Sequence, residues 1–238
     1  MAPDTAFYDQ RAASYAAASH DMDLRPLYAR FLPHVRPGGL ILDAGCGSGR
    51  DALAFRQAGF WVEAFDASPQ MARQAALLLE QDVPVLCFED VAWQDRFDGI
   101  WACASLLHVA PADLPDALRR LQRALRPGGV LAMNVIAAVE GEDGRLLRAI
   151  HAGLQRHFAR VEVFCVTDPR HPGQLQNLMV LAFSDAATAA SLRDGTGHSP
   201  EMAAMLACRY RPALPAIEPL RDDFAPVERF ALSLLRRP

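Results

Sequence analysis

The chain has 238 residues with 24 basic residues, all of them arginine, against 28 acidic ones, and its formal net charge is −4. This length suits one α/β domain with a substantial core, and the lack of lysine excludes Schiff-base chemistry, a pyridoxal-phosphate lysine and a P-loop lysine. Neither a basic cluster nor an apolar run of ~20 residues is present, so we expect a cytoplasmic protein acting on a small molecule, without nucleic-acid or membrane partners.

Residues 1–38 are predicted to form two helices. In the segment FYDQRAASY, Tyr8 and Tyr15 are seven positions apart and would share one helix face. A second helix is expected from Leu24 to Leu32, ending before Pro33. The two tyrosines either pack on an edge of the sheet or lie over a ligand.

The stretch LILDAGCGSGRD, from Leu40 to Asp51, predicts a strand, a glycine-rich turn and the start of a helix. The apolar residues indicate a strand buried on both faces. Alternate glycines let the backbone approach a ligand closely, with the free N–H groups of the next helix aimed at it. A dinucleotide pyrophosphate would fit such a turn. The G-x-G-x-G spacing and the carboxylates Asp43 and Asp51 instead favour a ligand with an ammonium and a sulfonium group, S-adenosylmethionine.

This turn resembles motif I of the class I S-adenosylmethionine-dependent methyltransferases. The resemblance implies that the turn holds the cofactor, with Asp43 bracing the loop and helping to hold the methionine end. It also implies that the leading helix folds over that end of the cofactor, with Tyr8 and Tyr15 as lid residues. Cys46 is expected to be a small packing residue and not a nucleophile. The cofactor-binding residues expected in the turn are Asp43, Ala44, Gly45, Cys46, Gly47, Gly49 and Arg50.

The second strand, FWVEAFD, ends at Asp66, about 20 residues after the glycine turn, where a carboxylate can accept hydrogen bonds from ribose hydroxyls. Ser68 and Pro69 are expected to open the next helix as its N-cap and first residue. Met71 lies one turn further on, either in the core or where adenine would stack. The cofactor-binding residues expected here are Asp66, Ala67, Ser68 and Met71.

A third strand is expected over VPVLCFED, residues 83–90, which closes in Glu89 and Asp90. A carboxylate at this strand end can accept hydrogen bonds from the adenine amino group. Asp90 is favoured over Glu89 for that role, with the Val91 backbone nearby. The alternative is a solvated strand end.

The run RFDGIWACASLLHV predicts a fourth strand, Gly99 to Cys103, followed by Ala104, Ser105 and His108. It resembles motif IV of the same enzymes, especially small-molecule methyltransferases of the tellurite-resistance type, which implies that Ala104 and Ser105 lie at the cofactor. His108 follows the strand at the edge where open α/β folds bind ligands, so it is the candidate catalytic base. In the alternative, His108 only closes a helical turn through a backbone hydrogen bond.

The remaining sequence predicts a sheet with one reversed strand. PADLPDALRRLQRALRPGG is an amphipathic helix ended by the L-x-P-G-G turn, before a fifth strand, VLAMNVI. A helix (145–158) and two strands (161–166 and 178–183) follow, and a hairpin makes the last strand antiparallel. We therefore expect an α/β fold, namely a three-layer, doubly wound, seven-stranded and mostly parallel sheet of the Rossmann-like class I methyltransferase type. Residues 1–185 would form this domain, and 186–238 a C-terminal helical extension packed on it.

Cysteine and histidine spacing gives no sign of a metal site. The five cysteines include no C-x-x-C pair, and the seven histidines include no H-x-H or H-E-x-x-H pattern. We therefore expect reduced, structural cysteines and no bound metal. The oligomeric state is expected to be a monomer or a homodimer.

From about Met133 onward the sequence resembles spermidine-synthase-like proteins, in NVIAAVEGEDGRLL, QNLMVLAF and DDFAPVE. This resemblance implies an alternative function, an aminopropyltransferase that uses decarboxylated S-adenosylmethionine. That family carries an aspartate at the end of its fourth strand. The matching residues of this chain are A-C-A-S, which include no carboxylate. A further alternative is a protein that binds the cofactor without catalysis. The first half of the sequence favours a methyltransferase that transfers the methyl group directly, in line, to a small-molecule acceptor. The protein would contribute proximity and exclusion of water to this reaction.

Overall fold

The computed structural model describes residues 9, 23–110, 112–141, 144–165, 171, 173–185, 209–210 and 214. The predicted lid residues Tyr8 and Tyr15 lie outside the described residues. So does nearly all of the predicted 186–238 extension.

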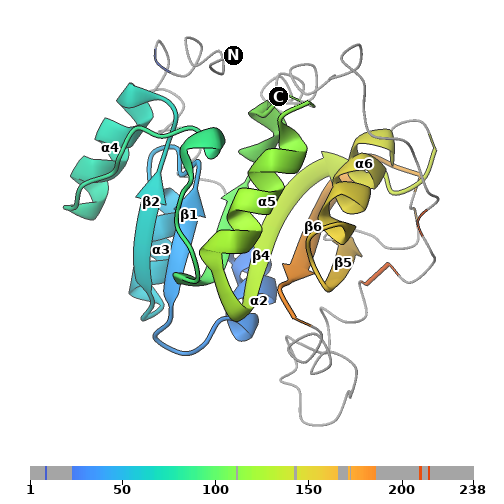
Figure 1. Cartoon of the computed structure of the whole chain (residues 1–238), viewed down its shortest axis with the longest axis horizontal. Coiled ribbons are helices and arrows are strands. Elements are labelled where there is room, and N and C mark those ends of the chain that lie inside the picture. Colours follow the sequence, from blue (N-terminus) through green and yellow to red (C-terminus); the bar gives the residue numbers. More distant parts are fainter. Residues whose placement is uncertain are drawn as a thin grey trace.

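Six strands form the central sheet: β1 (Leu40–Ala44), β2 (Trp61–Phe65), β3 (Phe97–Cys103), β4 (Leu125–Ala137), β5 (Arg160–Cys165) and β6 (Gln176–Phe183). Their order in the sheet is β2-β1-β3-β4-β6-β5 (Figure 1). The first four run parallel, whereas β6 is antiparallel to both β4 and β5. The reversed strand predicted from the hairpin is therefore confirmed.

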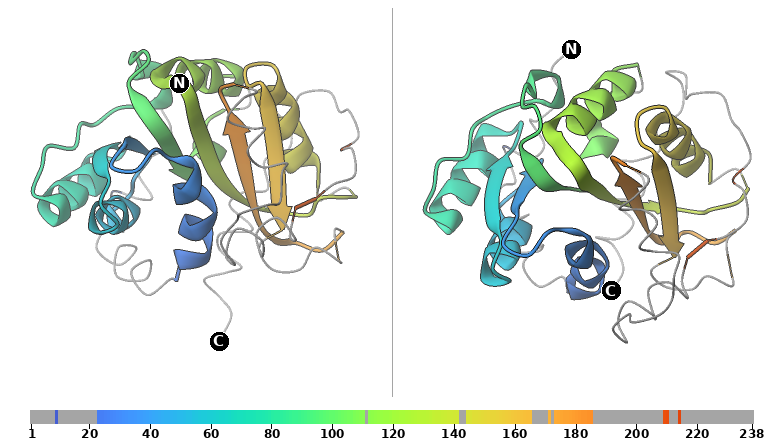
Figure 2. Two further views of the ribbon diagram at one scale, coloured as in Figure 1. Left: turned by 90° about the horizontal axis from the view of Figure 1, so that it is seen from below. Right: turned by 60° about the horizontal axis from the view of Figure 1, so that its bottom comes forward.

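Helices cover both faces of this sheet, as the three-layer prediction requires (Figures 1 and 2). One apolar cluster joins the sheet to α2 (Arg25–Phe31), α3 (Arg50–Gln57) and α4 (Pro69–Leu79) through side chains such as Phe31, Phe55 and Leu79. The other joins it to α5 (Leu114–Ala124) and α6 (Arg145–Gln155) through Leu118 and Leu154, among others. Each helix turns its apolar stripe inward, which is what stabilises short helices in a layered fold.

The third strand predicted over residues 83–90 is wrong, and the described sheet has six strands where seven were expected. Within this segment only Val85 pairs with the sheet, through a parallel bridge to Asp66. Pro84 has no N–H to donate to a strand ladder. Val85 is 51% exposed, so extending the strand here would bury little apolar surface. The segment ends in a short 3-10 helix, Phe88–Asp90.

The helix before β4 ends earlier than predicted. α5 stops at Ala124, and Leu125 belongs to β4, where it pairs with Phe97. The R-P-G-G residues then form an irregularity inside the strand, where the register shifts between Phe97 and Gly99 and Gly128 adopts a φ of +82°. A positive φ is easily reached by glycine, so the chain can bulge here and rejoin the ladder.

Two residues of the predicted extension lie along the outer edge of β5. Arg209 forms an antiparallel bridge with Phe164, and the Tyr210 N–H donates to the Val163 carbonyl over 2.8 Å. The Arg209 guanidinium also donates to the buried carboxylate of Glu162 over 2.6 Å. These contacts cover part of a strand edge that would otherwise present open backbone groups.

Candidate functional site

The glycine turn after β1 is fastened to the end of β2. The N–H groups of Gly45 and Cys46 both donate to the Phe65 carbonyl over 2.9 Å, and the Gly49 N–H donates to the Cys46 carbonyl over 3.0 Å. Gly49 is the N-cap of α3, with a φ of +86°. The loop is therefore shaped by its own backbone, so its conformation is fixed before any ligand arrives.

Two glycines of this turn have different surroundings. A Cβ at Gly45 would lie 2.5 Å from the Ser105 Cβ, so this glycine is required by packing as well as by its φ of +73°. A Cβ at Gly47, with a φ of +56°, would meet nothing within 4 Å. The turn thus packs its Gly45 side against the protein and leaves open space at Gly47, which is where a ligand could approach the backbone.

Asp66 braces the open side of the turn. Its carboxylate accepts hydrogen bonds from the Gly47 N–H over 2.7 Å and from the Ser68 N–H over 2.8 Å. Burial raises the pKa of Asp66 above its ordinary value, while these two N–H groups and the nearby His108 act to lower it. Each carboxylate oxygen has a second lone pair, so the group can still accept a hydrogen bond from a ligand hydroxyl.

Asp43 lies beneath the loop and is only 2% exposed. It accepts a hydrogen bond from the Ala52 N–H over 3.0 Å and so satisfies a free donor in the first turn of α3. Burial, followed by the charge of Asp51, raises the pKa of Asp43 well above its ordinary value. The bracing part of its predicted role agrees with this geometry, whereas a direct contact with a ligand would need an exposed oxygen.

Asp51 is the acceptor of a buried hydrogen-bond cluster and is 5% exposed. Its carboxylate accepts from the Tyr28 hydroxyl over 2.7 Å, the Trp101 indole N–H over 2.8 Å and the Arg50 guanidinium over 2.6 Å. Burial raises the pKa of Tyr28, and the Asp51 charge adds to this shift. Burial acts to lower the pKa of Arg50, but the hydrogen bond to Asp51 and the Asp51 charge together outweigh burial and leave that pKa raised.

The carboxyl end of β3 is tied to the carboxyl end of β1. Ala104 adopts a φ of +54°, which is uncommon for a residue with a Cβ. This turn directs Ser105 back toward the loop, where its hydroxyl donates to the Ala44 carbonyl over 2.6 Å. His108 follows in a 3-10 helix, and its backbone N–H donates to the Ser105 carbonyl over 3.1 Å. His108 and Asp66 therefore share one edge of the sheet, as their interaction indicates.

The start of α4 has the predicted cap. The Ser68 hydroxyl accepts from the Met71 N–H over 3.2 Å and donates to the Asp9 carboxylate over 2.6 Å. Asp9 itself therefore lies at this edge of the sheet. The Met71 side chain is buried in the core, and Ala67 is partly exposed beside the cap.

The predicted adenine-binding residues lie in the 3-10 helix after the missing strand. Glu89 and Asp90 are both exposed, and the Asp90 carboxylate accepts from the Cys87 N–H over 2.9 Å. Val91 is buried, and its carbonyl accepts from the Arg120 guanidinium over 3.1 Å. The Val91 backbone is thus used in packing, while both carboxylates remain reachable from solvent.

Cys46 is unsuited to nucleophilic chemistry. Burial, followed by the charge of Asp43, raises the pKa of the Cys46 thiol well above its ordinary value. A nucleophilic cysteine needs a thiolate, which this environment disfavours. The thiol acts as a small packing group, as expected from the sequence.

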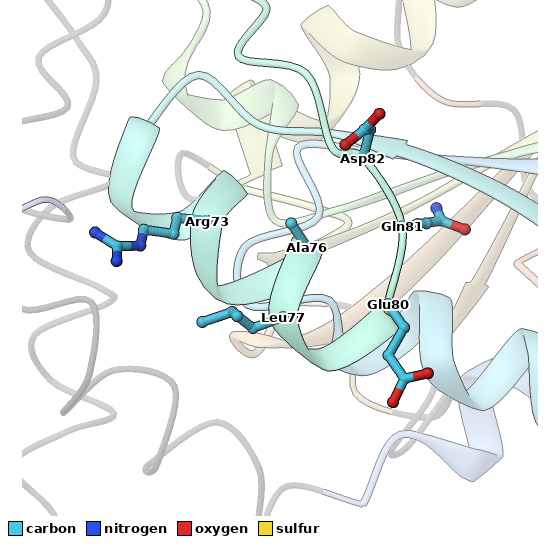
Figure 3. Close-up of a pocket in the computed structure, with 6 residues that line it drawn as sticks. All are labelled: Arg73, Ala76, Leu77, Glu80, Gln81 and Asp82. Atoms are coloured by element: carbon cyan, nitrogen blue, oxygen red, sulfur yellow. The ribbon is translucent and has the colours of Figure 1, made fainter.

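A surface hollow of about 500 Å³ lies away from these residues, on the outer side of α4 (Figure 3). Figure 3 shows side chains of α4 and of the turn after it around this hollow. None of its lining residues belongs to the glycine turn or to the carboxyl ends of β1, β2 and β3. The hollow is lined by Arg73, Ala76, Leu77, Glu80, Gln81 and Asp82.

Sequence reasoning missed several side chains at this edge. Tyr28 and Trp101 hold Asp51 in place; Tyr28 belongs to no motif, and Trp101 lies in the run that resembles motif IV without having been given a role. Asn134 and Asn177 hydrogen-bond to each other on adjacent strands over 2.6 Å. Asn134 gave a signal in the sequence, because it interrupts the apolar run LAMNVIA, whereas Asn177 follows Gln176 at the polar start of QNLMVLAF.

Across the residues with described positions, no group of three His, Cys, Asp or Glu side chains is arranged to hold a metal ion. Within the same ranges, the helices are too short or too polar to span a bilayer.

Comparison with known proteins finds one consistent family. Residues 17–179 match the family described as "Methyltransferase domain". The chain is 35% identical over 115 residues to a malonyl-[acyl-carrier protein] O-methyltransferase of Erwinia pyrifoliae, covering 45% of this chain and 42% of that protein. It is 37% identical over 119 residues to a trans-aconitate 2-methyltransferase of Deinococcus radiodurans, covering 48% and 44%. The chain therefore spans less than half the length of these two relatives.

Solved structures share the fold. The chain superposes on a 1,6-didemethyltoxoflavin-N1-methyltransferase of Burkholderia thailandensis with a TM-score of 0.56 and 24% identity, covering 77% of this chain and 91% of that one. That structure contains S-adenosylhomocysteine. The likeness of the second half to spermidine synthases receives no support from these matches, since the family match runs through both halves of the sheet.

Proposed function

This chain belongs to the methyltransferase-domain family, and from that premise we propose that it is an S-adenosylmethionine-dependent methyltransferase that transfers a methyl group directly to a small-molecule acceptor. The observation that carries the proposal is the glycine turn, which is fixed by its own hydrogen bonds and keeps open space at Gly47. A backbone surface of this kind fits a ligand that must lie against the chain.

The residues of this edge suit the parts of the cofactor. Asp66 would accept hydrogen bonds from the ribose hydroxyls through the lone pairs that Gly47 and Ser68 leave open. The exposed carboxylate of Asp90 would accept from the adenine amino group, at the end of the segment that pairs with Asp66 through Val85. The turn from Gly45 to Gly49 and the start of α3 would hold the methionine end.

Methyl transfer from a sulfonium needs few functional groups of the protein. Bound S-adenosylmethionine supplies an electrophilic methyl group on a sulfonium, which an acceptor atom can displace in line. The chain contributes the fixed loop that would orient this ligand for in-line displacement. His108 follows β3 at the same edge of the sheet and would take a proton from an acceptor that must lose one.

The small-molecule character of the acceptor is supported by the relatives. Two of them carry names that specify methylation of a malonyl thioester on a carrier protein and of trans-aconitate. Both substrates present carboxylates, whose oxygens are nucleophilic without a base near neutral pH. We extend to this chain the chemical class of carboxylate acceptors, with His108 dispensable for them.

Product analysis tests the proposal. The purified chain is incubated with methyl-labelled S-adenosylmethionine and a panel of acceptors that contains trans-aconitate, a malonyl thioester, benzoate, catechol, histamine and a simple thiol. The expected result is a methylated acceptor and an equal amount of S-adenosylhomocysteine. In a parallel incubation with decarboxylated S-adenosylmethionine and a diamine, aminopropyl transfer would replace the proposal by the spermidine-synthase-like alternative. Cofactor binding without transfer to any acceptor would favour a non-catalytic binding protein.

A further inference from the structure

The sequence contains two asparagines, Asn134 and Asn177, and the fold brings them into contact. Asn134 lies on β4 and Asn177 on the antiparallel neighbour β6, where each is one diagonal step from the other in the ladder. The Asn134 amide N–H donates to the Asn177 side-chain oxygen over 2.6 Å. Below them on the same sheet face lie only apolar residues of these strands, such as Ala132 and Leu181.

This pair lies at the ligand-binding edge of the sheet. Asn134 is level with Cys103, the last residue of β3, so the pair stands at the carboxyl end of the parallel strands. Ligands of open α/β sheets bind at that edge. The Cys103 thiol donates to the Asn134 side-chain oxygen over 3.2 Å. Cys103 also interacts with Asp51, near the start of α3. Asp51, Cys103, Asn134 and Asn177 thus form a row of polar side chains from the glycine turn to β6.

The hydrogen bonds define how both amides are oriented. Asn134 presents its oxygen to the Cys103 thiol and its nitrogen to Asn177. Asn177 in turn presents its oxygen to Asn134 and leaves its amide nitrogen pointing away from this bond.

The Asn177 nitrogen is an open donor. Among the residues that the structure describes, it donates no hydrogen bond, and the residue is partly exposed. Asn134 is 7% exposed, so the other half of the pair is buried. The bond to Asn134 uses only the oxygen of the Asn177 amide, so both hydrogens of its nitrogen remain able to donate to a ligand.

We propose that Asn134 and Asn177 form the acceptor-recognition subsite of this methyltransferase, in which the Asn177 amide donates to a carboxylate or carbonyl oxygen of the acceptor. This inference rests on the proposed function and adds to it the residues that select the acceptor. Asn134 is a positioning residue, because it orients Asn177 without contacting the acceptor.

The surrounding charge agrees with an acceptor of modest charge. The Arg50 guanidinium, which interacts with Cys103 of this row, is paired with Asp51. An amide donor can bind an oxygen without a full opposite charge, so a single carboxylate or a neutral carbonyl suits this position better than a phosphate.

The substitution Asn177→Asp isolates the open donor. The new carboxylate still accepts the hydrogen bond from Asn134, and only the outward N–H₂ is replaced by a negative oxygen. With a carboxylate acceptor of the panel, the KM should rise about tenfold or more, since a donor is lost and a like charge is added. The kcat and the affinity for S-adenosylmethionine should stay within about twofold of wild type.

Gln94→Glu is the matched control, because it makes the same change from amide to carboxylate at an exposed site before β3, at the opposite end of the sheet. Its KM should equal that of the wild type. An unchanged KM in Asn177→Asp would overturn the inference and leave the methyltransferase proposal standing. Efficient methylation by the wild-type chain of acceptors without a carbonyl oxygen, such as catechol and histamine, would do the same. Failure of the wild-type chain to bind S-adenosylmethionine would overturn both. Retained cofactor binding by the variant shows that it is folded.

Discussion

The glycine-turn edge and the β4–β6 edge of the same sheet treat their polar groups differently. At the first, the side chains of Asp43, Asp51 and Asp66 all accept hydrogen bonds from within the chain. At the second, the bond between Asn134 and Asn177 leaves one amide nitrogen open in the described part of the chain. The difference teaches that the edge proposed to bind the cofactor has most of its polar groups paired by the fold, whereas the edge proposed to bind the acceptor keeps an amide donor for a partner.

The largest effect is expected from removing the centre of the prebuilt edge. Asp51→Ala leaves the Tyr28 hydroxyl, the Trp101 indole and the Arg50 guanidinium without their acceptor in a buried site. The free energy of unfolding should fall by about 3–5 kcal/mol, as for a broken buried pair. Urea denaturation measures it, with exposed Asp82→Ala as the control, expected within about 0.5 kcal/mol of wild type. A loss below about 1 kcal/mol would show that the cluster does not support the loop.

The next comparison separates packing from ligand access in the turn. Gly45→Ala places a methyl group against Ser105 and should cost about 1–3 kcal/mol of stability. The methyl group of Gly47→Ala meets open space, so this variant should lose only about 1–2 kcal/mol of stability, from its positive φ. Its affinity for the cofactor should nevertheless fall by more than this loss of stability explains. Thermal unfolding and calorimetric binding on both variants check this. Equal affinity in Gly47→Ala and wild type would mean that the open space is not the ligand site.

A smaller effect is expected at the two carboxylates assigned to ribose and adenine. Asp66→Ala should weaken S-adenosylmethionine binding by about 1 to 3 kcal/mol, because the ribose hydrogen bonds and the brace at Gly47 are both lost. Asp90→Ala should cost about 1 kcal/mol, since this carboxylate is exposed. Wild-type affinity in both variants, by calorimetry, would contradict the assignment.

The smallest effect is a pH dependence. Burial raises the pKa of Asp66, so its carboxylate takes up a proton at a higher pH than an ordinary aspartate near 3.9. As pH falls through that raised pKa, the ribose acceptor is lost and cofactor affinity should decline, whereas above it the affinity should be constant. In Asp66→Asn this part of the decline should disappear. An identical pH profile in the two proteins would assign the decline to another group.

Local chemistry explains which features could be predicted from the sequence. The glycine turn, the Ser68 cap and the reversed last strand each depend on neighbouring residues, and the structure has the cap and the hairpin as expected. The strand over residues 83–90 failed because Pro84 and the exposed Val85 outweigh the apolar pattern. The contacts of Tyr28 with Asp51 and of Asn134 with Asn177 join distant segments, so only the tertiary structure could pair them.

Calorimetric titration of the purified chain with S-adenosylmethionine, S-adenosylhomocysteine and decarboxylated S-adenosylmethionine tests the central claim most directly. A methyltransferase site formed by the glycine turn should bind the first two more tightly than the third, because the methionine carboxylate contributes to binding. Preference for the decarboxylated compound, or no binding of any of the three, would contradict the account.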